Sequence, residues 1–147
     1  MLYLNFGEIG RRLSVRLRMI AAASQQGLEQ AMEKTETGTT LMGVWNEASE
    51  DARQRIVSKT LADNFTYADP SQPDILAGKR AFLDYLSLAR RRMNGVKIRL
   101  DGDVQTHHGH ARFRTIQQEN GETVGKGTYF ADFTENGRIW RLVNFKD

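Results

Sequence analysis

The sequence predicts an α+β domain, because helical patterns fill its first two thirds and strand patterns fill its last third. Asn-Gly pairs divide that last third into hairpins. Three consecutive hairpins predict an antiparallel, strongly bent sheet, and helices that precede such a sheet cover one of its faces. A chain of 147 residues is long enough to bury one substantial core.

The composition is that of an ordinary globular protein, with 39% hydrophobic and 27% charged residues. The chain has no cysteine, which excludes disulfides, thiolate nucleophiles and cysteine-ligated zinc. No apolar run approaches the roughly 20 residues that span a bilayer, so we expect no integral membrane association. Nothing requires an oxidising compartment, and we expect a cytoplasmic protein.

The net charge of +3 is concentrated near the N-terminus. The segment from Ile9 to Leu28 contains no acidic residue and four arginines: Arg11, Arg12, Arg16 and Arg18. Nucleic-acid-binding proteins carry such charge on the folded surface, among stacking aromatic residues, so we expect no nucleic-acid partner. The other basic cluster, 90–92, ends a helical pattern and complements the dipole of that helix.

Residues 1–34 predict an N-terminal basic amphipathic extension, ahead of a domain at 35–147. Its apolar residues recur at helical spacing: Ile9, Leu13, Leu17 and Ile20. One interpretation is a helix that packs on the domain or on a partner subunit, and another is a helix at a membrane surface. A third is a transit-like extension or an upstream start, since Met32 or Met42 would open a complete domain. The short apolar stripe favours the docked helix.

Three helices are predicted between Thr37 and Gly95. The first has one apolar face formed by Leu41, Val44, Trp45 and Ala48. The second begins at a cap, Ser49 or Asp51, and turns Ile56 and Leu61 inward. The third carries a stripe of Phe82, Tyr85, Leu86, Ala89 and Met93 and closes at Asn94 or Gly95. A short strand at 64–68 and a loop with Pro70, Pro73 and Gly78 separate the second helix from the third.

The last third predicts four strands, at 96–105, 110–118, 123–133 and 138–146. Their connections read THHG, ENGE and TENGR, which are hairpin turns. Gly125 and Gly127 lie inside the third of these strands. Glycine within a strand marks a bulge or bend in a curved sheet.

The order of these elements resembles the cone-shaped nuclear-transport-factor-2-like fold. Within that fold, residues 37–147 resemble the SnoaL-like and ketosteroid-isomerase-like proteins. The resemblance is carried by 67–70 (YADP), 78–82 (GKRAF), 112–113, Gly125, Gly127, 136–139 (NGRI) and 144–145. It implies three helices packed on a strongly curved, mostly antiparallel sheet. It also implies a homodimer through the open sheet face and chemistry without a cofactor.

The resemblance assigns Asp69, which precedes Pro70, to the position of the general base of ketosteroid isomerases. In those enzymes the base works beside a tyrosine and a protonated aspartate that bind the developing oxyanion. Here Trp45 stands in place of the tyrosine and Tyr129 in place of the acid. Trp45 offers one N–H donor without a titratable proton, whereas the phenol of Tyr129 can polarise a carbonyl.

Strand alternation predicts which residues surround Tyr129. If Tyr129 faces inward, so do Gly127, Ala131 and Phe133, because residues two apart share a face. On the neighbouring strand Phe113 faces inward, since Arg112 and Arg114 belong in water. The resulting ligand-binding set is aromatic and comprises Trp45, Tyr67, Phe82, Tyr85, Phe113 and Phe133. Such a pocket suits a small hydrophobic molecule held by one or two polar contacts.

The histidines at 107, 108 and 110 fall in a predicted hairpin turn. Neighbouring residues of a strand point to opposite faces, and no carboxylate is spaced to complete a metal site, so we expect no metal. At most one histidine faces the cavity as an acid or base. His108 is the candidate, because it precedes the turn glycine.

The sequence therefore predicts a SnoaL-like protein that binds a small hydrophobic, carbonyl-bearing molecule. As an enzyme it would be a cofactor-free isomerase, cyclase or hydrolase, with Asp69 as base and Tyr129 stabilising the resulting oxygen. Asp before Pro also opens turns, so a purely structural Asp69 remains an alternative. A non-catalytic ligand-binding or dimerisation module is the alternative function. A third hypothesis places the function in residues 1–34, as a partner or membrane helix.

Overall fold

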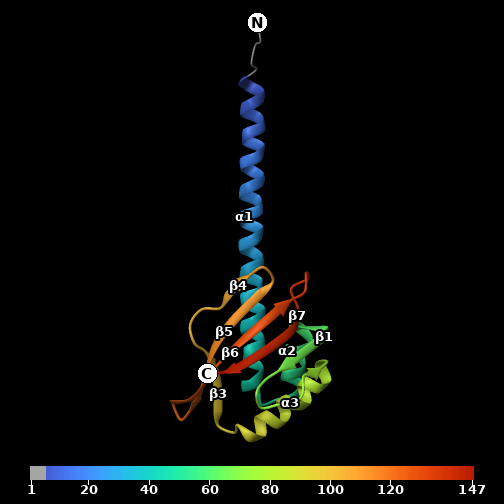
Figure 1. Cartoon of the computed structure of the whole chain (residues 1–147), viewed down its shortest axis with the longest axis vertical. Coiled ribbons are helices and arrows are strands. Elements are labelled where there is room, and N and C mark those ends of the chain that lie inside the picture. Colours follow the sequence, from blue (N-terminus) through green and yellow to red (C-terminus); the bar gives the residue numbers. More distant parts are fainter. Residues whose placement is uncertain (1–5) are drawn as a thin grey trace. The chain divides into compact units, whose positions relative to one another are not determined.

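A computed structural model describes residues 6–147 (Figure 1). The chain divides into two compact units, Met1–Met32 and Glu33–Asp147. Helix α1 runs from Phe6 to Met42 without a break. The side chains of Ile9, Leu13 and Ile20 lie outside the described part of the chain. No helix among the described residues is long and apolar enough to span a membrane.

The continuity of α1 differs from the two separate helices that the sequence predicts. Residues 21–36 are mostly Ala, Gln, Glu and other helix formers without proline, so nothing interrupts the helix. The predicted helix around Trp45 instead becomes a 3-10 turn, η1, at Gly43–Asn46. A start at Met42 would not give a complete domain, because Leu41 is 0% exposed in the core of the second unit.

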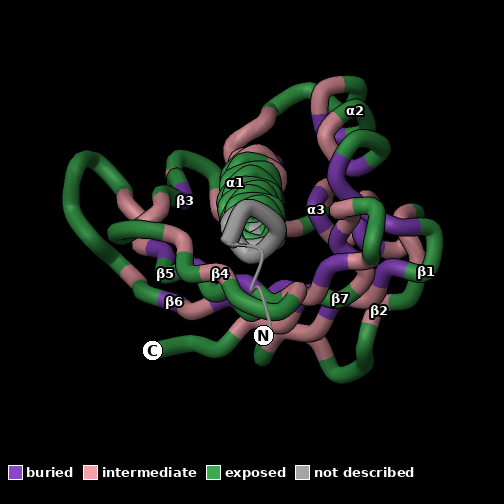
Figure 2. Tube along the Cα trace, turned by 90° about the horizontal axis from the view of Figure 1, so that it is seen from above, coloured by how far each residue is buried: buried purple, intermediate pink, exposed green. Residues whose placement is uncertain are grey.

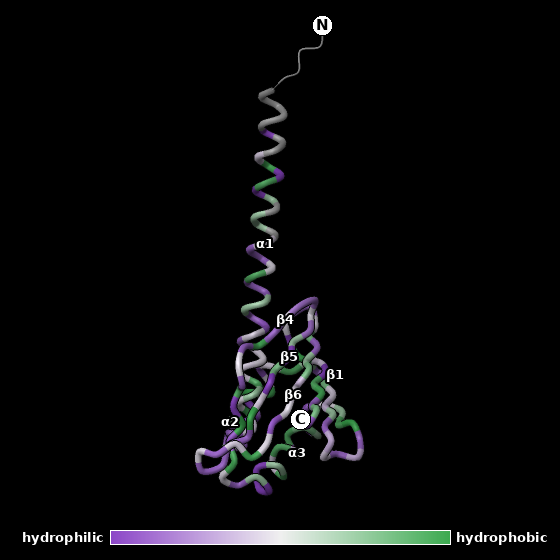
Figure 3. The backbone as a smooth tube through the Cα atoms, turned by 60° about the vertical axis from the view of Figure 1, so that its left-hand side comes forward, coloured by the Kyte–Doolittle hydropathy of each residue, from purple (hydrophilic) through white to green (hydrophobic). Residues whose placement is uncertain are grey.

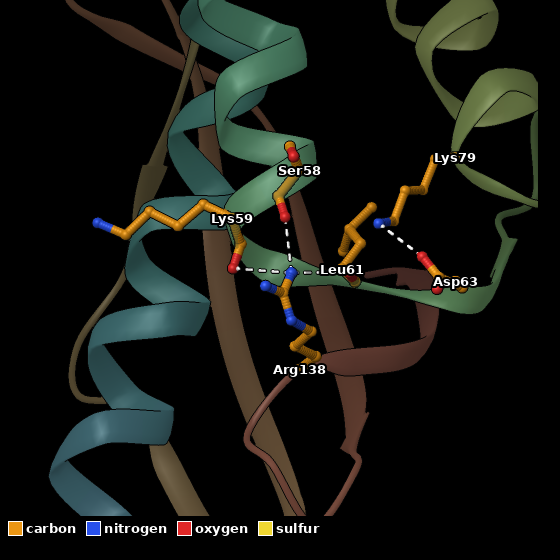
Figure 4. Close-up of polar contacts among 6 residues, drawn as sticks. All are labelled: Ser58, Lys59, Leu61, Asp63, Lys79 and Arg138. Atoms are coloured by element: carbon orange, nitrogen blue, oxygen red, sulfur yellow. Dashed lines mark hydrogen bonds and ion pairs between the residues drawn. The ribbon is translucent and has the colours of Figure 1, made fainter.

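Helix α2 spans Glu50–Thr60 and begins as predicted at Ser49, whose hydroxyl accepts a hydrogen bond from Ala52 N at 3.3 Å. Leu61 starts a strand rather than ending this helix. Nη1 of Arg138 donates to the carbonyls of Ser58 and Lys59 in the last turn of α2, at 2.6 and 3.4 Å, and to that of Leu61 at the start of β1, at 3.3 Å (Figure 4). A cation at a helix C-terminus is stabilising, so Arg138 fastens its turn to α2.

Helix α3 spans Lys79–Arg92, and Phe82 and Leu86 are the residues it buries. Three arginines fill its last turn, Arg90, Arg91 and Arg92, as the dipole argument predicts. Lys79 at its start forms an ion pair with Asp63 at 3.1 Å (Figure 4).

Seven strands form one mixed, curved and unclosed sheet. They are β1 Leu61–Ala68, β2 Leu76–Ala77, β3 Val96–Leu100, β4 Gln105–His107, β5 His110–Glu119, β6 Glu122–Phe133 and β7 Ile139–Lys146. The order is β2-β1-β7-β6-β5-β3, with β4 also paired to β5. All pairs are antiparallel except β1 with β7, which confirms the predicted mostly antiparallel α+β fold.

Besides the earlier start of β1 at Leu61, the strand boundaries differ from the prediction in two places. The predicted strand 96–105 is split into β3 and β4, with Gly102 between them at φ +84°. Strand β2 was not predicted, because its two residues are extended only through pairing with β1. The turn at Asn120 and Gly121 is as predicted, with φ of +51° and +80°. The β5–β6 register shifts beside Gly125, which confirms the predicted irregularity there.

The inner face of the sheet carries the residues that alternation predicts. On β5, Phe113 is buried between exposed Arg112 and Arg114. On β6, Tyr129 is buried and its neighbour Phe130 is exposed. Figure 2 shows buried segments on the strands and on α2 and α3. The prediction that Phe113 and Tyr129 face the interior is therefore confirmed.

Gly38 in α1 allows the Phe113 ring to lie directly against the helix backbone. A Cβ added at Gly38 would lie 2.2 Å from both Cε1 and Cζ of Phe113. Real Cβ atoms do not approach a ring so closely. Helix α1 and strand β5 can therefore pack at their present distance only if residue 38 is glycine.

We expect Gly38→Ala to lower the free energy of unfolding by about 1–3 kcal/mol, because Phe113 must leave its position in a packed core. This loss exceeds the gain of about 1 kcal/mol that alanine brings to helix propensity. Urea unfolding measures the difference. Gly43→Ala is the matched control, because a Cβ there meets nothing within 4 Å. Unfolding of Gly38→Ala at an unchanged or higher urea midpoint would contradict this packing.

Candidate functional site

Asp69 follows β1 and closes a tight turn with one of its carboxylate oxygens. Oδ1 accepts hydrogen bonds from the backbone N–H of Ser71 at 2.6 Å and from the Ser71 hydroxyl at 2.5 Å. Gln72 N donates to the carbonyl of Asp69 at 3.2 Å, across Pro70. This is the Asx-type turn that Asp before Pro favours. The turn interpretation of Asp69 is therefore confirmed for Oδ1.

The other oxygen, Oδ2, points to two tyrosines. The hydroxyls of Tyr67 and Tyr85 each donate to it at 2.7 Å, and the two phenol oxygens lie 3.4 Å apart. Tyr67 belongs to β1 and Tyr85 to α3, so one carboxylate joins a strand, a turn and a helix. The two tyrosines, predicted as ligand contacts, are hydrogen-bond partners of Asp69.

The rings behind this carboxylate form a continuous aromatic cluster. The Trp45 ring lies 5.4 Å from Tyr129, 5.8 Å from Phe82 and 6.1 Å from Tyr67, between centroids. Tyr67 and Phe82 are 5.0 Å apart. The fold thus brings together six of the residues singled out from the sequence: Trp45, Tyr67, Asp69, Phe82, Tyr85 and Tyr129. It adds Phe65, 5.0 Å from Phe82, which the sequence analysis did not select.

Phe113 and Phe133 belong to the same buried core. Phe113 lies opposite Tyr129 in the β5–β6 register. Phe133 lies farther along β6, opposite Ile139, and its N–H donates to the carbonyl of Gly109 at 2.9 Å. Phe113 therefore adjoins the cluster through Tyr129, whereas the backbone of Phe133 is hydrogen-bonded to the β4–β5 turn.

The structure does not bring His108 to this cluster. His108 is exposed in the β4–β5 turn at φ +46°, with its Nδ1 3.3 Å from that of His107. His110 is paired with Asp132, which also accepts from Nε of Arg141 at 2.5 Å. Across residues 6–147, no group of three metal-binding side chains is positioned to hold an ion.

Asp69 is half-buried, and two opposing effects set its pKa. Burial raises the pKa, but the hydrogen bonds from Ser71, Tyr67 and Tyr85 outweigh it and leave the pKa below the ordinary value of 3.8. The carboxylate is therefore ionised at neutral pH. Its affinity for a proton is low while all four donors are in place.

The tyrosines are shifted in the opposite direction. Burial raises the pKa of Tyr85 to about 12. Burial also raises the pKa of Tyr67 and of Tyr129 well above the ordinary value of a phenol, with further contributions from neighbouring groups of the cluster. All three phenols therefore keep their protons at neutral pH, and those of Tyr67 and Tyr85 donate to ionised Asp69.

Ser71, like Phe65, is a site residue that the sequence analysis missed. Asp-Pro-Ser carries the signal, because an Asp side chain commonly accepts from the N–H two residues on. The contacts of Tyr85 with Asp69 had no local signal, since sixteen residues and a loop separate them.

Comparison with known proteins finds relatives among solved structures. No family model matches the sequence, and no curated protein matches it at a significant level. A proposed isomerase of the SnoaL-like family from Agrobacterium tumefaciens is 26% identical at a TM-score of 0.73, covering 79% of this chain and 98% of that one. This chain belongs to the SnoaL/NTF2-like superfamily.

Two more distant structures share the fold of this SnoaL-like protein. A proposed ketosteroid isomerase from Kribbella flavida is 13% identical at a TM-score of 0.61, with 80% of this chain and 79% of that one covered. An NTF2-like protein of unknown function from Exiguobacterium is 19% identical at a TM-score of 0.58, with 76% and 98% covered.

We expect Asp69→Asn to destabilise the protein by about 1–2 kcal/mol at pH 7, because the amide nitrogen cannot accept from two phenols. A group whose folded-state pKa is lowered stabilises the protein above its unfolded-state pKa. That contribution is lost as the pH falls through the folded-state pKa. The difference between wild type and Asp69→Asn should thus be constant above about pH 4 and shrink on acidification below 3.8.

Urea unfolding of both proteins at intervals from pH 7 to pH 2.5 measures this difference. Asp74→Asn is the control, because Asp74 is exposed in the same loop. A wild-type to Asp69→Asn difference that does not change with pH would contradict an ionised, hydrogen-bonded Asp69.

Proposed function

We propose that this SnoaL-like protein binds a small hydrophobic molecule bearing a carbonyl group, and that Asp69 acts on it as a general base. The observation that carries the proposal is the half-buried carboxylate at the edge of an aromatic cluster. Carboxylates are rarely buried beside apolar side chains unless they are paired or serve a function. Apolar rings with a few convergent polar groups are also the usual composition of a small-molecule site.

The chemistry follows from the protonation states. Ionised Asp69 accepts a proton from the carbon beside the carbonyl, and the electron pair of that C–H bond moves to the carbonyl oxygen. A protonated phenol, that of Tyr85 or Tyr129, donates to the enolate oxygen. Trp45 closes the apolar side of the site.

Ligand binding would strengthen this base. The hydrogen bonds from Tyr67 and Tyr85 keep the pKa of Asp69 low in the free protein. An apolar ligand displaces water from the carboxylate, and its carbonyl competes for one phenolic proton. Both changes raise the pKa of Asp69 towards a value suited to proton abstraction. The likeness to a proposed isomerase of the SnoaL-like family supports this function.

We expect the wild type to catalyse exchange of α-protons for deuterium in at least one member of a panel of hydrophobic ketones and enones. Asp69→Asn should reduce that exchange at least about 100-fold, which is the usual contribution of a general base. Proton NMR in D2O follows the exchange directly, whatever the final product. Exposed Asp74→Asn serves again as the matched control. An exchange rate unaffected by Asp69→Asn would remove this residue from the mechanism.

The second candidate is a non-catalytic binding module, and the saturation of Asp69 by four donors favours it. In that case the wild type binds members of the panel without proton exchange. Binding can be followed by the fluorescence of Trp45 after Trp140→Phe removes the other tryptophan. Binding without α-proton exchange identifies the module, and Tyr85→Phe should then weaken that binding.

The homodimer expected for this fold stays a prediction. Its candidate surface is the outer face of the sheet, where Phe130 and Phe145 are 44% and 56% exposed with ring centroids 5.8 Å apart. An exposed aromatic pair on a sheet is a common contact between copies.

A further inference from the structure

Asn144 of β7 lies between the proposed base, Asp69, and Tyr129 on the inner side of the sheet. It is the partner of Tyr129 in the antiparallel β6–β7 register. On its other side, the parallel β1–β7 register pairs Ala68 with Val143. Asp69 follows Ala68 directly, so it reaches the level of Asn144. Neighbouring strands lie about 4.8 Å apart, so Asn144 is next to both residues in the sheet.

The side chain of Asn144 is on the same face of the sheet as the aromatic cluster. Residues two apart in a strand share a face, and Leu142 of β7 is 0% exposed in the core. Tyr67 of β1, two residues before Asp69, is also 0% exposed. Figure 3 shows hydrophobic residues mixed with hydrophilic ones along the strands, as expected where one face of a sheet is buried. Asn144 therefore adds a polar group to the inner row that holds Asp69 and Tyr129.

The amide of Asn144 has no hydrogen-bond partner among residues 6–147. Its Oδ1 is buried and unpaired, and Nδ2 donates to no described residue. A Cβ added at Gly127 would lie 3.1 Å from this Oδ1, so the oxygen lies over the bare backbone of the glycine. The hydroxyl of Thr115, 3.5 Å from the same Cβ position, donates to the carbonyl of Gly127 instead, at 3.2 Å. With the oxygen on this side, Nδ2 faces away from Gly127 with its N–H groups unused.

An amide without partners is unusual beside a packed core. Leaving a buried acceptor unpaired costs free energy, and native structures keep few such groups. The Asn144 amide thus contributes little to the stability of the fold, which points to a ligand as its partner. The hydroxyls of Tyr67 and Tyr85 are already engaged by Asp69, at 2.7 Å each. Asn144 and Tyr129 are then the residues of the inner row that carry a donor for a substrate oxygen.

We infer that Asn144 is a further catalytic residue, which donates a hydrogen bond from Nδ2 to the carbonyl oxygen of the substrate. Asp69 removes the proton from the adjacent carbon, and the electron pair of that C–H bond moves to the carbonyl oxygen. The enolate oxygen then accepts from Nδ2 of Asn144 and from the hydroxyl of Tyr129, which are neighbours in the sheet. This inference rests on the proposed function and identifies the donors to its oxyanion.

Asn144→Leu should lower the rate of α-proton exchange about 100-fold, because one oxyanion donor contributes about that much. Proton NMR in D2O measures the rate with the same panel of ketones and enones. Asn144→Asp should lower the rate at least as far, because a carboxylate of the same shape has no N–H and repels an enolate. Asn64→Leu is the matched control, since Asn64 is an exposed asparagine of β1.

The free energy of unfolding separates a catalytic amide from a structural one. Because the Asn144 amide has no partner, Asn144→Leu should leave the urea midpoint unchanged or raise it. A midpoint that falls while exchange stays at the wild-type rate would give Asn144 a structural role and overturn the inference.

A binding measurement tests the same amide without catalysis. 2-Naphthol carries an enolate-like oxygen on a flat apolar ring system, and naphthalene is the matched probe without that oxygen. Asn144→Leu should weaken binding of 2-naphthol about fivefold, the effect of one lost hydrogen bond, and leave binding of naphthalene unchanged. NMR titration of the full chain measures both affinities, and circular dichroism checks the fold of each variant.

The outcomes distinguish this inference from the proposed function. Exchange that depends on Asp69 but not on Asn144 overturns the inference and leaves the proposed function standing. Binding of 2-naphthol that depends on Asn144, without exchange of any panel member, overturns Asp69 as the base and supports Asn144 as the residue that binds the oxygen. Neither exchange nor Asn144-dependent binding overturns both.

Discussion

The carboxylate of Asp69 is the interaction on which the organisation of the site depends. Oδ1 closes the turn after β1, and Oδ2 receives the hydroxyls of Tyr67 and Tyr85. Without an ionised acceptor there, two part-buried phenols would lose their partner at the edge of an apolar core, where an unmade hydrogen bond is expensive. Strand β1, the turn after it and α3 are thus linked by hydrogen bonds to one carboxylate.

The same interaction decides how the site behaves chemically. The donors that hold Asp69 in place also lower its pKa, so structural support and basicity oppose each other. A ligand that takes one phenolic hydrogen bond and excludes water would shift that balance towards a stronger base. The raised pKa values of Tyr85 and Tyr129 keep both phenols protonated.

The two units of the chain have different sources of stability. Glu33–Asp147 buries its own core, in which the Phe113 ring lies against Gly38. In the preceding part of α1, the described side chains from Arg11 to Gln30 are exposed.

The sequence by itself determined the α+β class, the hairpin turns and the inner residues of β5 and β6. Each depends on a local rule: Asn-Gly turn chemistry, period-two alternation, or the solvation of Arg112 and Arg114. It also singled out the members of the aromatic cluster other than Phe65, with the help of the resemblance carried by residues such as 67–70 and 78–82. These signals lie within a few residues of the features that they predict.

Tertiary structure alone decided what Asp69 contacts. Tyr85 reaches Oδ2 because α3 folds back over β1, and the Phe113 ring fits only because Gly38 of α1 leaves room for it. It also separated His108 from the cluster, since the β4–β5 turn leaves that side chain exposed. Contacts between residues distant in sequence depend on how whole elements pack, and no local pattern specifies them.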